Sequence, residues 1–310
     1  MTGVYVKKCF DEVVDTSEGA LSAHLQRIAH EELGETPEKR REALEELKRQ
    51  LDAEPDLNAR KDDEFLLRFL RVRKYDVDLA LRNVRNYYRN RDSSGSVYVD
   101  FLPSNVPPAA RTLYMRMTEK DVLGRPIFVF RPGMWMPEEV PYMDFHRAGL
   151  ICYEHLACDP VVQTVGIVLL VDFSGFTADK LLSMSISLLR RALEYIQDCM
   201  PIRLKAVHVV KQSYAFDMLF ALVRPFTKSK LAQRARFHGE NFERLHEEIP
   251  PEVLPEEYGG HGPALDFDAF WKEVEASEEN FEANNRFGYG ASGADTLPED
   301  CEQPQECTPL

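Results

Sequence analysis

The sequence predicts an α/β fold in which a mostly parallel sheet follows an all-helical amino-terminal lobe. Residues 166–173, GIVLLVDF, and residues 206–210 are apolar on both faces, which is typical of parallel strands that are covered on each side. A long helical pattern at residues 178–199 separates these two strands, so a crossover connection should join them.

The helical lobe is predicted from three helices, each of which begins at a recognisable start signal. Thr36-Pro37 begins the first, because proline suits a first helical position, where no backbone N–H is needed. Asp62 or Asp63 can cap the second helix and Asp76 the third. Apolar residues recur on one side of each helix, so we place the lobe at residues 36–100.

The second domain contains further strand and helix patterns. Short strands are predicted at residues 114–117 and 127–130, with a turn between them. Helical patterns follow at residues 214–223 and from about 227 to 235. We place this domain at residues 105–265.

The two ends of the chain differ from its middle. Residues 1–35 lack a sustained pattern and are predicted to be a partly disordered lead-in with a short helix near 21–33. Residues 266–274 begin a carboxy-terminal helix. Residues 275–310 are acidic and poor in large apolar side chains, so we expect a disordered tail.

The net charge of -14 over 310 residues argues against a general affinity for nucleic acid. The average hides an asymmetry, because residues 201–239 carry eight Lys or Arg and only one acid, Asp217. Residues 240–310 reverse this balance, with 19 acids and three bases. The sequence therefore predicts a basic surface within an acidic protein.

The compartment is expected to be the cytosol. The first residues, MTGVYVKKCFDEVVD, lack the apolar core of a secretory signal, and no apolar run approaches the roughly 20 residues of a membrane-spanning helix. The six cysteines form no CxxC pair and no zinc-ligand spacing, so we expect reduced thiols and no metal.

Motifs for catalysis and cofactor binding are missing from the sequence. No P-loop, G-x-G-x-x-G or G-x-S-x-G motif occurs. Cys152 and His155 are close in sequence, but a buried thiol beside a core histidine is the commoner arrangement. His208 and His238 fall on predicted strands and are expected to be core or pocket-edge groups. We therefore expect no enzyme, no catalytic residue and no cofactor.

Several separated segments resemble the CRAL-TRIO family, including its tocopherol-transfer, retinaldehyde-binding and clavesin branches. The segments are DDEFLLRFLRVRKYDVDLAL at 62–81, LLVDFSGF at 169–176, MPIRLKAVHVVKQSYAFDMLFALVRPFTKSKLAQRARFHG at 200–239 and LPEEYGG at 254–260. The resemblance implies a CRAL-TRIO fold, in which the sheet forms the floor of a hydrophobic pocket and a mobile helix forms its lid.

The resemblance also implies which residues form the pocket and the lid. The pocket residues are His146, Gly149, Tyr153, Ile167, Val171, Ala192, Tyr195, Ile196, Met200, Ile202 and Val207, and the lid residues are Phe216, Leu219 and Leu222. Lys211-Gln212-Ser213 stands where the family often has Asn-x-Pro, so the lid hinge should differ. Periodicity alone would make all of these residues ordinary core.

Five basic residues match positions at which family members bind phosphoinositide headgroups: Arg73, Arg203, Lys205, Lys230 and Arg234. Converging cations suit phosphates, and arginine binds them bidentately. The alternative is a solvated basic face that balances the acidic tail. If the patch binds headgroups, docking should also loosen the adjacent lid.

The expected function is an intracellular lipid-binding and transfer protein that carries one hydrophobic molecule and docks peripherally on endosomal or other phosphoinositide-bearing membranes. Retinoid, tocopherol-like and other lipids all remain open as cargo. The alternative is a clavesin-type trafficking scaffold that reads phosphoinositides without stoichiometric cargo, and an enzyme acting in the same pocket is a third reading. We expect a monomer that has no nucleic-acid partner.

Overall fold

The computed structural model describes residues 22–289. The amino-terminal lobe is formed by α2 (Ala23–Ile28), the π-helical turn η1 (Ala29–Leu33), α3 (Pro37–Asp52), α4 (Asp63–Val72) and α5 (Val77–Ser93). The predicted start signals are confirmed, because the side chains of Thr36, Asp62 and Asp76 each accept a hydrogen bond from a backbone N–H of the first helical turn. The described part of the lead-in is mostly helical, because it contains α2 and η1.

An aromatic cluster holds α4 against α5. The rings of Phe65, Phe69, Tyr87 and Tyr88 pack at centroid distances of 5.0–6.3 Å, and all four side chains are at most 1% exposed. Such pairs add to the stabilisation from burial itself. The lobe therefore has an apolar core of its own.

The second domain contains a five-stranded sheet of order β2-β3-β4-β5-β6. Its strands are β2 (Tyr114–Lys120), β3 (Pro126–Phe130), β4 (Ile167–Asp172), β5 (Leu204–Val210) and β6 (Ala235–Gly239). Strand β2 pairs with β3 in antiparallel orientation, and the pairs β3-β4, β4-β5 and β5-β6 are parallel. The predicted α/β class and mostly parallel sheet are confirmed.

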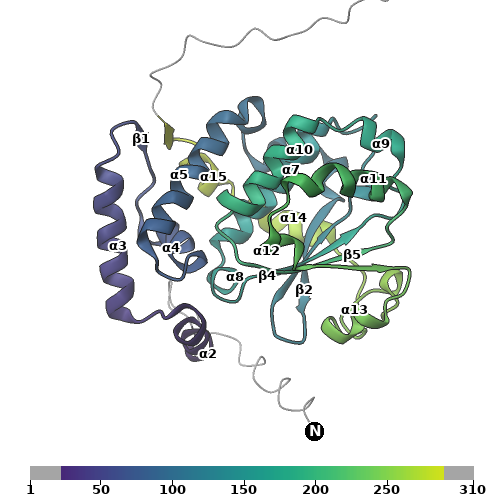
Figure 1. The fold of residues 1–310 in the computed structure, drawn as a ribbon, viewed down its shortest axis with the longest axis horizontal. Helices are drawn as coiled ribbons and strands as arrows, with labels where there is room; N and C mark the ends of the chain where they lie inside the picture. Colours follow the sequence, from purple (N-terminus) through teal and green to yellow (C-terminus); the bar gives the residue numbers. More distant parts are fainter. Residues whose placement is uncertain (1–21, 290–310) are drawn as a thin grey trace, which may run out of the picture.

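Helices cover the sheet and connect its strands (Figure 1). Between β3 and β4 lie η4 (Pro132–Met134), α7 (Tyr142–Cys158) and α8 (Pro160–Val165), and between β4 and β5 lie α9 (Ala178–Leu182), α10 (Ile186–Glu194) and η5 (Tyr195–Cys199). Between β5 and β6 lie α11 (Tyr214–Val223), η6 (Arg224–Phe226) and α12 (Ser229–Ala232). Shorter connections are η2 (Gly95–Tyr98), η3 (Pro103–Asn105), α6 (Pro108–Arg111), α13 (Glu243–Glu248) and η7 (Glu256–Tyr258). Within residues 22–289, no helix is both long and apolar enough to span a bilayer.

Two predicted helices are corrected. The helix at residues 178–199 is three shorter pieces, because Ser185 leaves the helical conformation and its hydroxyl caps α10 by accepting from the backbone N–H of Leu188. The helix at residues 227–235 is the four-residue α12, and the chain is already extended at Ala235, where β6 begins.

The predicted disordered tail is wrong for its first part. Helix α14 (Phe267–Ala276) is followed by α15 (Glu278–Asn284) and by β7 (Gly288–Tyr289), which pairs with β1 (Leu57–Asn58) of the lobe. Phe281 is 5% exposed and Asn284 donates to the Tyr87 hydroxyl at 2.7 Å. This segment therefore ties the end of the described chain to the helical lobe. Residues 1–21 and 290–310 lie outside the described residues.

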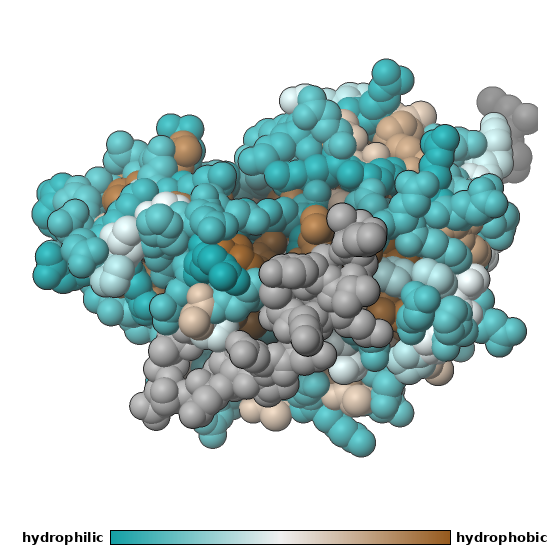
Figure 2. Space-filling model, turned by 90° about the horizontal axis from the view of Figure 1, so that it is seen from below, coloured by the Kyte–Doolittle hydropathy of each residue, from teal (hydrophilic) through white to brown (hydrophobic). Residues whose placement is uncertain are grey.

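The lobe and the sheet domain are distinct in outline. Seen from below, the part that contains α3 is separated by a notch from the broader part that contains the sheet, and hydrophobic residues are visible near the base of the notch (Figure 2). Arg68 of the lobe forms a buried ion pair with Glu154 of α7 across this junction, and the neighbouring Arg71 pairs with Glu35 within the lobe. Arg71 also donates to Gln163 of α8 at 2.7 Å. Polar contacts as well as apolar ones therefore hold the lobe to the sheet domain.

Candidate functional site

A largely apolar cavity of about 300 Å³ lies between one face of the sheet and the helices α7, α10, α11 and α12. Alternate residues of the strands point into it, such as Leu169 and Val171 of β4 and Val207 and Val209 of β5. Its volume is at the lower end of the roughly 300–1,000 Å³ typical of ligand pockets. The sheet is thus the floor of the cavity, as predicted.

The cavity wall carries no charged side chain among the described residues. Most of the lining is aliphatic or aromatic, and its polar members are tyrosines, Thr227 and His146. Burial raises the pKa of Tyr153 far above its usual range and lowers the pKa of His146 to about 4. Both groups are therefore neutral at physiological pH.

The lowered pKa of His146 predicts acid sensitivity. An unfolded histidine titrates near pH 6.5, so between about pH 6.5 and pH 4 the unfolded chain binds a proton that the folded chain does not. Stability is therefore lost as the pH falls through this window, by about 3 kcal/mol for this one residue. His146→Leu should remove that loss, as measured by urea unfolding at pH 7 and pH 4.5.

His155 and His208 also have lowered pKa values, so the comparison must isolate one residue. The exposed His261→Leu variant is the matched control and should keep the pH dependence of the wild type. If His146→Leu lost as much stability on acidification as the wild type, His146 would not be held neutral by burial.

Eight of the eleven predicted pocket residues line the cavity. They are His146, Gly149 and Tyr153 of α7, Val171 of β4, Ala192 of α10, Tyr195 and Ile196 of η5, and Val207 of β5. The spacing of the three α7 residues places them on one face of that helix. The structure brings this group together from five elements.

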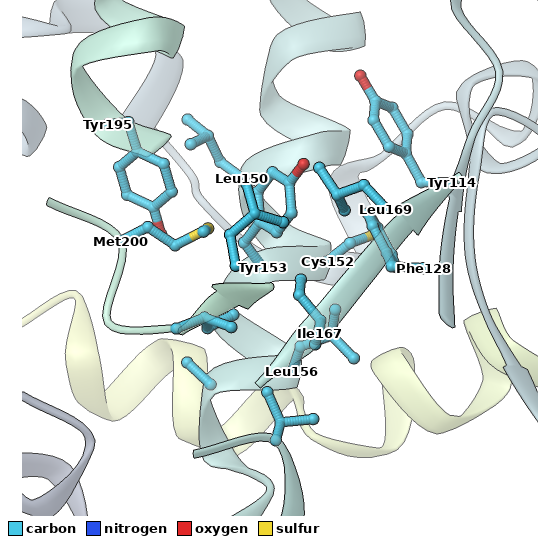
Figure 3. Close-up of a cluster of buried hydrophobic side chains, with 14 of the residues drawn as sticks. Tyr114, Phe128, Leu150, Cys152, Tyr153, Leu156, Ile167, Leu169, Tyr195 and Met200 are labelled. Carbon is cyan, nitrogen blue, oxygen red and sulfur yellow. The ribbon is translucent and has the colours of Figure 1, made fainter. Parts of the chain in front are cut away.

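The other three predicted pocket residues are buried outside the cavity wall. Ile167 begins β4, and Figure 3 shows it near Leu156 at the end of the cluster away from Tyr114. Met200 and Ile202 flank Pro201 in the connection from η5 to β5, and both are only 3% exposed. None of the three lines the cavity, although Ile167 shares a face of β4 with Leu169 and Val171, which do.

The lid prediction needs one correction. Phe216 and Leu219 of α11 line the cavity, as do Phe220 and Val223. These four positions follow the i, i+3, i+4, i+7 spacing of a single helix face. Leu222 lies off that face and lines a groove between α10 and α11 instead. Periodicity within α11 was the signal that could have identified Phe220 and Val223.

The predicted lid hinge, Lys211-Gln212-Ser213, makes several hydrogen bonds. Lys211 has a φ of 52°, which is a left-handed conformation uncommon for a residue with a Cβ, and its backbone N–H donates to Gly239 at 2.8 Å. The Gln212 side chain accepts from the Gly239 N–H at 3.1 Å, and the Ser213 hydroxyl donates to Phe176 at 2.9 Å. The segment that departs from the family pattern thus anchors α11 to β6 and to the loop after β4.

The predicted basic residues gather where β5 and α12 meet the end of α4. Burial and the positive charges of Arg234, Arg73, Lys74 and Arg203 lower the pKa of Lys230. Burial also lowers the pKa of Lys205, as does nearby Arg203, whereas hydrogen bonding to Glu32 opposes this shift. We call Arg73, Lys74, Arg203, Lys205, Lys230 and Arg234 the basic cluster. Lys74 was not predicted, although it follows Arg73 directly in the sequence.

Glu32 of η1 is a carboxylate that enters the basic cluster. It forms ion pairs with Arg203 and with Lys205, the latter at 2.7 Å. Lys230 and Arg234 have no ion pair with a described residue. No pattern in the sequence indicates this contact, because Glu32 lies in the lead-in, far from Arg203 along the chain. On one side of the cluster two cations thus share a single carboxylate, and on the other side Lys230 and Arg234 carry unpaired positive charge.

Comparison with known proteins decides the family. A model of the CRAL/TRIO domain matches residues 110–260, and a model of the CRAL/TRIO N-terminal domain matches residues 20–85. A human protein described as alpha-tocopherol transfer protein-like is 36% identical over 265 residues, which cover 84% of this chain and 77% of that protein. The chain belongs to the CRAL/TRIO family.

Other CRAL/TRIO proteins extend this likeness. Rat clavesin-2 is 32% identical over 253 residues, which cover 80% of this chain and 77% of that protein. The crystal structure of Sfh5 aligns with a TM-score of 0.53 at 11% identity and covers 81% of this chain and 92% of its own. The family resemblance seen in the sequence is therefore confirmed, and the Sfh5 alignment supports the fold.

Proposed function

We propose that this CRAL/TRIO protein binds one small hydrophobic molecule in the cavity and exchanges it at phosphoinositide-containing membranes. The uncharged cavity beneath α11, with the basic cluster next to it, is the observation that carries the proposal. Relatives whose descriptions name tocopherol transfer support the carrier function. The cytosol and the surface of endosomal or similar membranes are the proposed locations.

Burial of the cargo can supply the affinity. Each methylene group removed from water contributes about 0.8 kcal/mol, so ten of them contribute roughly 8 kcal/mol before the cost of association. A wall without charged groups does not oppose this transfer. Apolar contact therefore provides the affinity, and the few polar groups are left to select the ligand.

Residues 227–235 connect the cavity to the basic cluster. Leu231, Ala232 and Ala235 line the cavity, whereas Lys230 and Arg234 of the same short segment belong to the cluster. A phosphate that draws these two cations outward would therefore pull on one wall of the cavity. This geometry supports a coupling between headgroup binding and opening of the cavity near α11.

Exposed apolar side chains beside α11 support docking on a membrane. Leu182 of α9 is 81% exposed, and Tyr214 and Met218 of the neighbouring α11 are 79% and 42% exposed. Large apolar groups in such numbers at one site mark interaction surfaces, and a bilayer interface accepts them. Attraction by the basic cluster and insertion of these side chains would act together.

Removing two free cations should weaken docking and slow transfer. Each basic side chain near an anionic leaflet contributes about 1 kcal/mol, so Lys230→Ala with Arg234→Ala should lower vesicle affinity by roughly 30-fold at low salt. Glu32→Gln should raise affinity, because it frees Arg203 and Lys205. Flotation with vesicles containing phosphatidylinositol bisphosphate measures binding, and movement of a fluorescent tocopherol analogue between vesicles measures transfer.

Lys120→Ala with Arg244→Ala is the matched control, because it removes one lysine and one arginine outside the basic cluster. That variant should bind and transfer like the wild type. Equal losses of vesicle binding in both double variants would show that only the net charge of the protein matters, and would refute a specific headgroup site. Vesicle binding without transfer of any lipid would instead favour the scaffold function.

A further inference from the structure

Four polar side chains that line the cavity are more than nine-tenths buried: Tyr114, His146, Tyr153 and Tyr195. The hydroxyls of two of them donate hydrogen bonds to other groups of the protein. Tyr114 donates to the backbone carbonyl of Phe145 at 3.0 Å, and Tyr195 donates to Glu154 Oε1 at 3.3 Å. The hydroxyl hydrogens of Tyr114 and Tyr195 are therefore already bound within the protein.

His146 and Tyr153 differ from that pair. Among residues 22–289, neither the His146 imidazole nor the Tyr153 hydroxyl has a hydrogen-bond partner, although the side chains are only 8% and 7% exposed. Their polar atoms are also not among the fully buried atoms that lack a partner. Both groups thus face the open space of the cavity.

Unpaired polar groups at such a place call for a ligand. Leaving a buried donor or acceptor without a partner is unfavourable, and native proteins rarely do so without a functional reason. The two residues lie on one face of α7, seven positions apart, which is about 10 Å along the helix axis. They therefore mark two separate points on one wall of an otherwise apolar chamber.

The chemistry of these groups defines the ligand class. A neutral imidazole and a phenol each donate and accept one hydrogen bond, which suits a hydroxyl or carbonyl oxygen. No lysine or arginine lines the described cavity to balance an ionised carboxylate or a phosphate. A small volume also favours a single-chain or compact molecule over a phospholipid with two acyl chains.

We infer that the cargo is a neutral lipid bearing a hydroxyl or carbonyl oxygen, which His146 or Tyr153 binds inside the cavity. This assignment rests on the proposed carrier function and deepens it by naming the class of cargo. The two side chains are specificity-determining: they select among oily molecules that the apolar wall would otherwise accept alike.

The test compares two probes that differ by one oxygen, 1-dodecanol and n-dodecane. Both are delivered to the full-length protein from cyclodextrin, and the bound amount is quantified by gas chromatography after gel filtration. The wild type should bind the alcohol more tightly than the alkane. In the His146→Leu/Tyr153→Phe double variant, alcohol affinity should fall about tenfold while alkane affinity stays unchanged or rises.

The single variants His146→Leu and Tyr153→Phe show which residue binds the oxygen of the alcohol, since only the loss of that residue should lower alcohol affinity. Tyr88→Phe, which removes a buried phenol in the helical lobe, should keep the selectivity of the wild type. If the wild type binds neither probe, the carrier function itself fails. If it binds both, and the double variant keeps the same ratio of alcohol to alkane affinity, the carrier function stands and the role of His146 and Tyr153 is refuted.

Discussion

Arg68→Met should destabilise the protein by about 3–5 kcal/mol, because it leaves a carboxylate buried without its cation. Arg68 Nη1 lies 3.5 Å from Glu154 Oε2, and the two side chains are 6% and 5% exposed. Glu154 also accepts from the hydroxyl of Tyr195, whose ring lines the cavity. The loss should appear as a lower urea midpoint with an unchanged slope.

The double variant Arg68→Met/Glu154→Leu distinguishes the loss of the ion pair from the effect of leaving one charge unpaired. Replacing both charges with apolar groups of similar size should restore most of the lost stability, since no unpaired charge remains. A single variant that lost less than about 1 kcal/mol would contradict this account, because Glu154 would then have to be solvated or protonated in the native protein.

The central strands could be predicted because their apolar composition directly indicates that they are buried. Strands β4 and β5 are covered on both faces and are apolar almost throughout, so no other assignment competes. Helix α11 was predicted with the observed bounds, since residues 214–223 are strongly apolar and Pro225 follows closely. Local pattern and tertiary environment agree in these elements.

Elements at the edge of the sheet were harder to predict. Strand β6 reads ARFHG and is partly exposed, so it has no apolar run that would distinguish it from the end of a helix. Ser185 looks like an ordinary position within one continuous helical pattern, and only the break between α9 and α10 shows it to be a cap. The segment after residue 275 reads as a polar tail, because Phe281 is an isolated apolar residue whose ring partner, Phe101, is far away in the sequence.

The candidate site was predictable as a group and not residue by residue. Family resemblance brought eight pocket residues to one cavity, but it could not show that Ile167 and Met200 do not line it, although both belong to the same buried cluster as Tyr153 (Figure 3). The contact of Glu32 with the basic cluster joins distant parts of the chain and leaves no pattern in the sequence. The missing partners of His146 and Tyr153 likewise depend on three-dimensional packing alone.

Ala192→Trp should abolish cargo binding without unfolding the protein. Ala192 is on the cavity side of α10, so an indole at this position would occupy much of the roughly 300 Å³ that a ligand needs. Filling an existing space costs less than overpacking a filled core, so the thermal midpoint should stay close to that of the wild type. Ser187→Trp places the same side chain on an exposed position of α10 and should leave binding intact.

Native mass spectrometry of the purified full-length protein, followed by extraction and identification of any bound lipid, tests the central claim most directly. The wild type and Ser187→Trp should each carry one neutral lipid per chain, and Ala192→Trp should carry none. A wild type that remains empty after exposure to a cell lipid extract, or that carries the same lipid as Ala192→Trp, would contradict the assignment of this cavity as the cargo site.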